Sequence, residues 1–108
     1  MERMDKLKEM IAAYPNDCFS RHALALEYMK LGQTSSAIDE MEQLLLIDPN
    51  YIGTYYHLAK AYQKLDNLVI ALEILEKGIR IAVNLSSEND LRELKNALQQ
   101  LKDEIEEN

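Results

Sequence analysis

The sequence contains one short pattern twice, as "AYPND" at residues 13–17 and as "IDPNY" at residues 47–51. Each stretch holds a proline followed by asparagine, and the chain has no other proline. Proline disfavours the helical conformation in the residue before it, and Asn or Asp side chains cap the start of helices. We therefore predict that each stretch joins two helices. The predicted caps are Asn16 or Asp17 at the first joint and Asn50 at the second.

Other residues repeat at the spacing of the two prolines, which is 34 residues. The paired identities are Leu24–Leu58, Ala25–Ala59, Tyr28–Tyr62, Lys30–Lys64, Leu31–Leu65, Ala37–Ala71 and Ile47–Ile81. Most of these positions are apolar or small, and the larger apolar residues recur at the intervals of one helix face. This pattern indicates two copies of one packing unit. The small residues predicted at close crossings of antiparallel helices are Ala25, Ala37, Ala59 and Ala71.

With this period and these residues, the sequence resembles the tetratricopeptide repeat family. The stretch 21–49, "RHALALEYMKLGQTSSAIDEMEQLLLIDP", holds the family's Leu, small residue, Tyr, Gly, Ala and Pro in order, and the stretch 55–83 repeats most of them. The departures from the family pattern are Arg21, Leu44 and Ala82–Val83. The resemblance implies an all-α fold, a right-handed α-solenoid of antiparallel helix hairpins.

We expect residues 1–108 to form a single domain of about six helices. Its predicted parts are a lone half-repeat helix at 1–14, repeats at 18–51 and 52–85, and a capping helix at 87–106. Gly32, and at higher cost Asp66–Asn67, are predicted to take the left-handed conformation that ends a helix. Ser87 and Asp90 are predicted to form a capping box at the start of the last helix.

The last helix is predicted to cover the second hairpin with an apolar stripe. The stripe consists of Leu91, Leu94, Leu98 and Leu101. Gly78 would let this helix approach closely, and Lys95 stands where the repeats have a small residue. We interpret the acidic end "DEIEEN", residues 103–108, as the solvated end of this helix rather than as a recruitment signal.

The composition excludes several classes of function. The net charge of −7 argues against non-specific binding to nucleic acid, whose phosphates would repel the chain. No stretch approaches the roughly 18 apolar residues of a membrane span, and the start "MERMDKLKEM" lacks the apolar core of a signal peptide. The single cysteine, Cys18, cannot form an internal disulfide. We expect a soluble, cytoplasmic protein.

The sequence offers little chemistry for catalysis. Cys18 and His22 lie four residues apart and, with His57, are residue types that bind zinc, but no fourth ligand is evident. No acid, base and nucleophile fall in a recognisable motif. We therefore predict no enzyme activity, no metal and no cofactor.

In the family, the first helix of each repeat lines the concave face, so the resemblance implies a binding groove there. The candidate groove residues are Phe19, His22, Leu26, Met29, Tyr56, Lys60, Gln63, Arg92 and Asn96, with Asn89 and Gln99 beside them on the last helix. This face is predicted to hold no Asp or Glu, because the acids fall on the second helices. Such a face suits a peptide or protein segment with apolar anchors and an acidic group.

Two other interpretations stay open at this stage. The N-terminal helix or another neighbour could cover Leu26 and Met29, and the lysines and Arg92 could be ordinary solvated charges. Some family members clamp a terminal carboxylate with Lys and Asn one turn apart. Arg92 and Asn96 have similar spacing, but His22, Leu26 and His57 stand at the partner positions, so we do not expect this clamp.

The predicted function is a protein–protein interaction module or scaffold. The alternative is a self-associating, homodimeric repeat protein. In that alternative the lone first helix pairs between two copies through Met1, Met4, Leu7 and Ile11.

Overall fold

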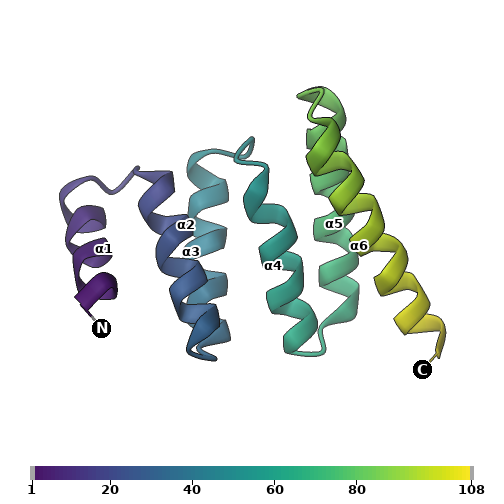
Figure 1. Ribbon diagram of the computed structural model, residues 1–108, viewed down its shortest axis with the longest axis horizontal. Helices are drawn as coiled ribbons and strands as arrows, with labels where there is room; N and C mark the ends of the chain where they lie inside the picture. The colour runs from purple at the N-terminus through teal and green to yellow at the C-terminus, as the bar shows by residue number, and fades with distance from the viewer. Residues whose placement is uncertain (1, 108) are drawn as a thin grey trace. The chain divides into compact units, whose positions relative to one another are not determined.

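The computed structural model describes residues 2–107, which form six α-helices and no strand (Figure 1). The helices are α1 (Glu2–Ala13), α2 (Cys18–Lys30), α3 (Thr34–Ile47), α4 (Gly53–Lys64), α5 (Leu68–Asn84) and α6 (Glu88–Glu107). The prediction of an all-α chain with about six helices is confirmed. The chain divides into an N-terminal unit, residues 1–51 with α1 to α3, and a C-terminal unit, residues 52–108 with α4 to α6.

Three turns between successive helices share one hydrogen-bond pattern. After α2, the Gln33 N–H donates to the Tyr28 carbonyl at 2.9 Å, and Gly32 takes the left-handed conformation with φ 74°. The turns after α4 and α5 repeat this Schellman motif with Asp66 at φ 60° and Ser86 at φ 55°. The predictions for Gly32 and Asp66 are confirmed. Ser86 was not predicted, because Ser is not a residue type that favours this conformation.

The joint at Asp17 is built as predicted, whereas the joint at Asn50 is not. Asp17 caps α2, since its carboxylate accepts hydrogen bonds from the backbone N–H of Ser20 at 3.4 Å and from its hydroxyl at 2.7 Å. The prediction that Asn50 caps α4 is wrong. The residue before α4 is Ile52, which has no polar side chain, and the Asn50 N–H donates to the carboxylate of Asp48 at 3.0 Å. The side chain that stabilises this joint is therefore that of Asp48, which precedes the proline, and not that of Asn50, which follows it.

In the N-terminal unit, α1 packs on α2 through four buried side chains: Met4, Leu7, Ala23 and Leu24. Ile11 and Tyr28 pack against this cluster and are partly buried. The predicted small residues of the hairpin α2–α3, Ala25 and Ala37, have no exposed surface. The lone first helix therefore contributes to the core of its unit.

Arg21, a departure from the family pattern, joins three parts of the N-terminal unit. Its guanidinium forms an ion pair with Glu40 of α3 at 3.0 Å and donates to the carbonyl of Pro15 at 2.9 Å. Only 13% of the Arg21 side chain is exposed, so the pair is well shielded from solvent. At this position the charged side chain of Arg21 stands where the family has an aromatic residue, and it links α2 to α3 through its ion pair with Glu40.

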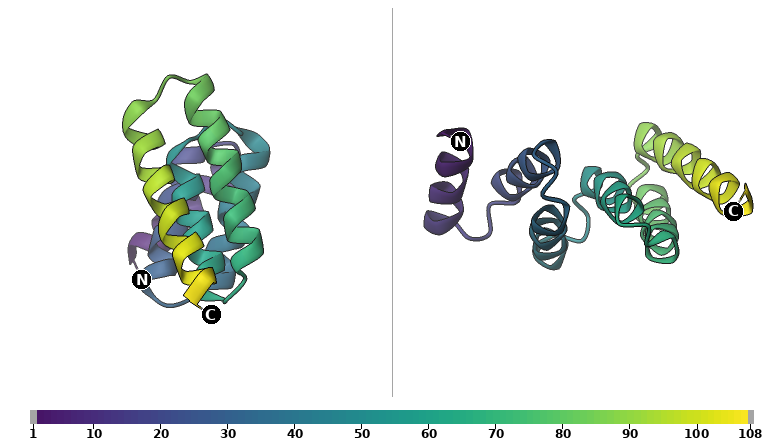
Figure 2. Two further views of the ribbon diagram at one scale, coloured as in Figure 1. Left: turned by 90° about the vertical axis from the view of Figure 1, so that its right-hand side faces the viewer. Right: turned by 90° about the horizontal axis from the view of Figure 1, so that it is seen from below.

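In the C-terminal unit, α5 packs against both α4 and α6, and α6 runs antiparallel to α5 (Figures 1 and 2). Gly78 of α5 is buried at the point where all three helices meet. A β-carbon added there would lie 2.9 Å from Tyr55 Cβ and 3.3 Å from Leu94 Cδ1. The prediction that Gly78 lets α6 approach closely is confirmed, and α4, which was not predicted to lie there, is closer still. Ala59 and Ala71 are buried as predicted.

The buried face of α6 differs in part from the predicted leucine stripe. Leu94 and Leu101 are buried together with Ala97, whereas Leu91 and Leu98 are only partly buried. Before α6, the hydroxyl of Ser87 donates to the Asp90 carboxylate. The Ser87 backbone N–H, which a capping box would pair with that carboxylate, donates to the Ala82 carbonyl at 3.0 Å instead, so the predicted capping box is not formed. Leu91 and Leu98, the other two residues of the predicted stripe, therefore lie beside the buried face of α6 and not at its centre.

Candidate functional site

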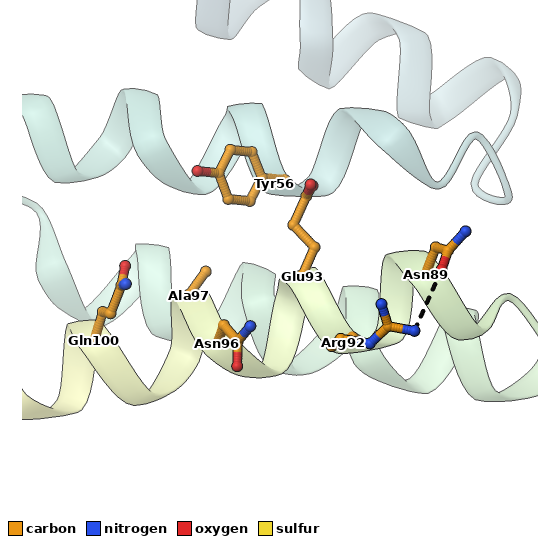
Figure 3. A pocket seen from close by; sticks show the side chains of 7 residues that line it. All are labelled: Tyr56, Asn89, Arg92, Glu93, Asn96, Ala97 and Gln100. Carbon is orange, nitrogen blue, oxygen red and sulfur yellow. Dashed lines mark hydrogen bonds between the residues drawn. The ribbon is translucent and has the colours of Figure 1, made fainter.

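The C-terminal unit holds a hollow of about 440 Å³ between α4 and α6 (Figure 3). Its lining residues are Tyr56, Asn89, Arg92, Glu93, Asn96, Ala97 and Gln100. Three of the predicted groove residues, Tyr56, Arg92 and Asn96, are therefore brought together around one space. Amide side chains supply much of the lining, and such groups can pair with the backbone of an extended peptide.

The aromatic ring of Tyr56 is contacted by two neighbours on α4. Lys60 Nζ lies 5.4 Å from the ring centroid, and the ring of His57 lies 5.4 Å away in an edge-to-face arrangement at 87°. A cation over an aromatic face is attracted by the ring quadrupole. Lys60 is thus held beside the hollow, so that a ligand contacting Tyr56 would meet a positive charge.

The face of α6 that borders the hollow carries a cation and an anion. The Arg92 guanidinium donates to the amide oxygen of Asn89 at 3.3 Å (Figure 3). The next residue, Glu93, points its carboxylate toward α4 (Figure 3). Burial lowers the pKa of His57 on α4, and the Glu93 carboxylate opposes that shift.

The prediction that this face holds no Asp or Glu is wrong for α6. Glu93 lines the hollow, and Glu104 accepts a hydrogen bond from the amide of Gln63 at 3.0 Å. Gln63, a predicted groove residue, is therefore paired with an acid. The predicted Gln99 does not line the hollow; its amide donates to Asp103 at 3.0 Å.

The register of α6 explains these differences. Because α6 buries Leu94, Ala97 and Leu101, the residues at its border with α4 follow the spacing of Glu93, Ala97, Gln100 and Glu104. The prediction instead placed Asn89, Arg92, Asn96 and Gln99 on this border. The helical spacing between the fully buried leucines was the signal that could have placed Glu93 correctly.

The predicted groove residues of the N-terminal unit separate into two surroundings. Phe19, 67% exposed, lines a hollow of about 560 Å³ together with residues of α1: Glu2, Arg3, Lys6, Leu7 and Met10. His22, Leu26 and Met29 do not line it, and all three are partly buried. The His22 ring lies 5.6 Å from the ring of Tyr51 at 45°. The four predicted groove residues of α2 therefore do not line one common hollow.

Features that bear on metal binding and membrane insertion are few. Within residues 2–107, no three His, Cys, Asp or Glu side chains form a group that could hold a metal ion. Burial raises the pKa of the Cys18 thiol, and the carboxylates of Asp48 and Asp17 add to this shift, so its thiolate form is disfavoured. In the part of the chain that the structure describes, every helix is too short or too polar to cross a membrane.

The residues predicted for self-association are largely occupied within the chain. Met4 and Leu7 are buried against α2, and Ile11 is partly buried against the same cluster. Met1 lies outside the described residues. Pairing two copies through Met4 and Leu7 would require α1 to separate from α2.

Comparison with protein-family models gives two matches. A model described as a TPR repeat matches residues 25–66, and a model described as a tetratricopeptide repeat matches residues 52–84. The matched residues overlap the two repeats recognised by the 34-residue spacing. The search of curated proteins gave no match.

Solved structures resemble the chain over most of its length. A tetratricopeptide repeat domain protein from Salinibacter ruber is 40% identical, with 81% of this chain and 88% of that chain covered and a TM-score of 0.76. The Sgt2 TPR domain from Aspergillus fumigatus is 26% identical, with coverage of 96% and 66% and a TM-score of 0.82.

A third structure, the TPR2B domain of yeast Sti1 in complex with pHsp70, is 22% identical, with coverage of 94% and 81% and a TM-score of 0.87. This likeness shows the tetratricopeptide α-solenoid fold. The repeats in the sequence, the helix hairpins and the similarity to the Salinibacter protein agree. The chain belongs to the tetratricopeptide repeat family.

Proposed function

We propose that this chain is a protein-interaction module that binds a peptide or a segment of another protein, and that it catalyses no reaction. The observation that carries this proposal is the hollow between α4 and α6, where Tyr56, Arg92 and Asn96 surround one space. The hollow combines an aromatic ring, amide groups and a guanidinium, which are groups that recognise peptides.

The charges near the hollow favour a ligand with an acidic group. Helix α4, of sequence GTYYHLAKAYQK, has no Asp or Glu although the whole chain has a net charge of −7. Lys60 lies over the Tyr56 ring, and Arg92 borders the hollow from α6. We infer that an apolar anchor of the ligand contacts Tyr56 and that its carboxylate lies near Lys60 or Arg92, away from Glu93.

The comparisons support a peptide-binding role at the level of the fold. The TPR2B domain of Sti1 was solved as a complex with pHsp70, and PcrH was solved with the chaperone-binding region of PopD. Their identities of 22% and 16% limit the inference to the fold, which can hold a peptide. We further propose that Phe19, His22, Leu26 and Met29 contribute to peptide binding in the N-terminal unit. A single functional domain and a cytoplasmic location stay predictions.

Selection from a random peptide pool displayed on phage would test the proposal. The pool is bound to the whole chain and then counter-selected against the double variant Tyr56→Ala, Arg92→Glu. We expect peptides that combine an apolar residue with Asp, Glu or a free carboxyl end, and that bind the double variant about tenfold more weakly, which is about 1.4 kcal/mol.

A matched control uses the same residue types at exposed positions elsewhere, in the double variant Tyr14→Ala, Arg80→Glu. The selected peptides should bind this control as they bind the wild type. Peptides that bind both double variants equally well, or a pool with no enrichment, would contradict the proposed site.

A further inference from the structure

The C-terminal unit holds a second hollow, at the opposite end of α6 from Arg92. It has a volume of about 760 Å³ and is lined by Asp66, Asn67, Leu68, Val69 and Ile105. The turn between α4 and α5 and the last turns of α6 lie at the same end of the C-terminal unit (Figure 1). The hollow therefore brings residues from distant parts of the sequence to one surface.

The apolar side chains at this end are open to solvent. Val69 is 66% exposed, Leu65 is 50% exposed and Ile105 is 39% exposed. Ile105 follows the fully buried Leu101 by one helical turn, so the apolar stripe of α6 continues beyond the part that α5 covers. A group of exposed apolar side chains rimmed by polar residues is typical of an interaction surface.

The charge around this hollow is negative. Asp66 is the one charged residue in its lining, and Glu104 and Glu106 flank Ile105 in the sequence. The last turn of α6 holds no basic residue, although a helix C-terminus carries a partial negative charge. The nearest cations along the sequence are Lys64 and Lys102. A cationic group at this end of the C-terminal unit would therefore be attracted by the Asp66 carboxylate and by the acidic last turn of α6.

We propose that this hollow, which we call the acidic-end hollow, docks a basic segment of a partner protein. An apolar side chain of that segment packs between Val69 and Ile105, and Lys or Arg side chains lie beside Asp66 and Glu106. This site goes beyond the proposed function, because it lies at the other end of α6 and takes a partner of the opposite charge. One chain could then hold an acidic and a basic segment at the same time.

The probe for this site is a synthetic peptide of alternating Leu and Lys, and its matched control replaces every Lys by Glu. Amide chemical shifts of the whole chain are followed by NMR during titration. We expect the Lys peptide to give saturable shifts at Asp66, Val69 and Ile105, whereas the Glu peptide gives none there. Binding should weaken with added salt, since exposed charges are screened.

Variants separate the charge from the apolar contact. Asp66→Asn removes a carboxylate and keeps the turn, because Asn tolerates the left-handed conformation. We expect Asp66→Asn combined with Glu106→Gln, and separately Val69→Ser, each to weaken binding of the Lys peptide about tenfold, or 1.4 kcal/mol. The matched controls are Glu73→Gln on α5 and Leu46→Ser, the latter at a residue that is 79% exposed in the N-terminal unit.

The controls should bind the Lys peptide as the wild type does. Equal binding by all variants, shifts spread over the acidic faces of α3 and α5, or no saturable binding would each overturn the proposal. The double variant Tyr56→Ala, Arg92→Glu should leave this binding unchanged. Failure of the acidic-end hollow is therefore distinguishable from failure of the α4–α6 site.

Discussion

Gly78 of α5 lies so close to Tyr55 of α4 that a β-carbon at position 78 would stand 2.9 Å from the β-carbon of Tyr55. Tyr55 Cβ is fixed to the backbone of α4, so the contact cannot be relieved by rotating a side chain. A β-carbon at position 78 would also lie close to Leu94 of α6. The absence of a side chain at this position therefore allows α4, α5 and α6 to pack this closely.

Replacing Gly78 by Ala should destabilise the chain. Alanine favours the helix by about 1 kcal/mol relative to glycine, but forcing a methyl group into a packed crossing costs about 1–3 kcal/mol. We expect a net loss of about 1 kcal/mol in the free energy of unfolding, measured by urea denaturation. Gly53→Ala is the control, because a β-carbon there meets nothing within 4 Å. Equal stability of the two variants would show that α4 and α5 are not held at this distance.

Ser86 offers the opposite change at a turn. Its φ of 55° costs a side chain about 1–2 kcal/mol that glycine avoids, while glycine loses more conformational entropy on folding. We expect Ser86→Gly to raise the free energy of unfolding by about 0.5–1 kcal/mol. Ser35→Gly, at an exposed position within α3, should lower it instead. Thermal unfolding followed by circular dichroism would rank the three proteins, and a destabilised Ser86→Gly variant would refute the left-handed turn.

Helix α6 should be needed for a folded C-terminal unit. Burying one leucine contributes roughly 1.5–3 kcal/mol, and α6 places Leu94 and Leu101 fully inside. Deleting residues 87–108 should therefore give an unfolded or aggregated protein in sedimentation and circular dichroism. A soluble, monomeric and cooperatively folded 1–86 fragment would disprove this.

Trimming only residues 104–108 is the matching experiment. It removes the exposed hydrogen bond from Gln63 to Glu104 and should change the free energy of unfolding by less than about 0.5 kcal/mol. The trimmed protein should nonetheless lose its affinity for the Leu–Lys peptide, because Ile105 and Glu106 are gone. A marked loss of stability would mean that the last turn of α6 supports the core.

His57 should make stability depend on pH. Burial lowers its pKa in the folded chain, so the unfolded chain binds the proton more readily. The contribution of His57 is then complete above its ordinary pKa of about 6.5 and is lost as the pH falls below that value. We expect His57→Gln to lose less stability than the wild type between about pH 7.5 and about pH 5.5 in urea denaturation. Identical slopes for the wild type and His57→Gln would contradict the burial of His57.

The helices and hairpins were predictable because the 34-residue identities constrain packing. Ala59 and Ala71 have to be small wherever two helices cross closely, and the sequence repeats them at Ala25 and Ala37. It was harder to predict which of two neighbouring polar side chains forms a given hydrogen bond. Asp48 and Asn50 flank the same proline, and only the three-dimensional arrangement shows that Asp48 accepts the hydrogen bond.

The site was predicted where a repeat served as a template and missed where none did. Tyr56 lies on a repeated helix, and its place beside the hollow follows from the repeat. Helix α6 has no second copy in the chain, so its rotation depends on the fit of Leu94 and Ala97 against its neighbours. That rotation brings Glu93 to the hollow. The hollow that Phe19 shares with α1 was not predicted either, because α1 has no preceding helix in the sequence to serve as a template, and a binding role for Phe19 stays a prediction.

Arg21 has a consequence for how the N-terminal unit opens. Its guanidinium bonds at once to Glu40 of α3 and to the carbonyl of Pro15, just after α1. A helix of 12 residues such as α1 is only marginally stable on its own. Because one shielded side chain ties the end of α1 to α3, native-state hydrogen exchange in these two segments should occur in a single cooperative step. If the Arg21 contacts were removed, the amide hydrogens of α1 should exchange before those of α3.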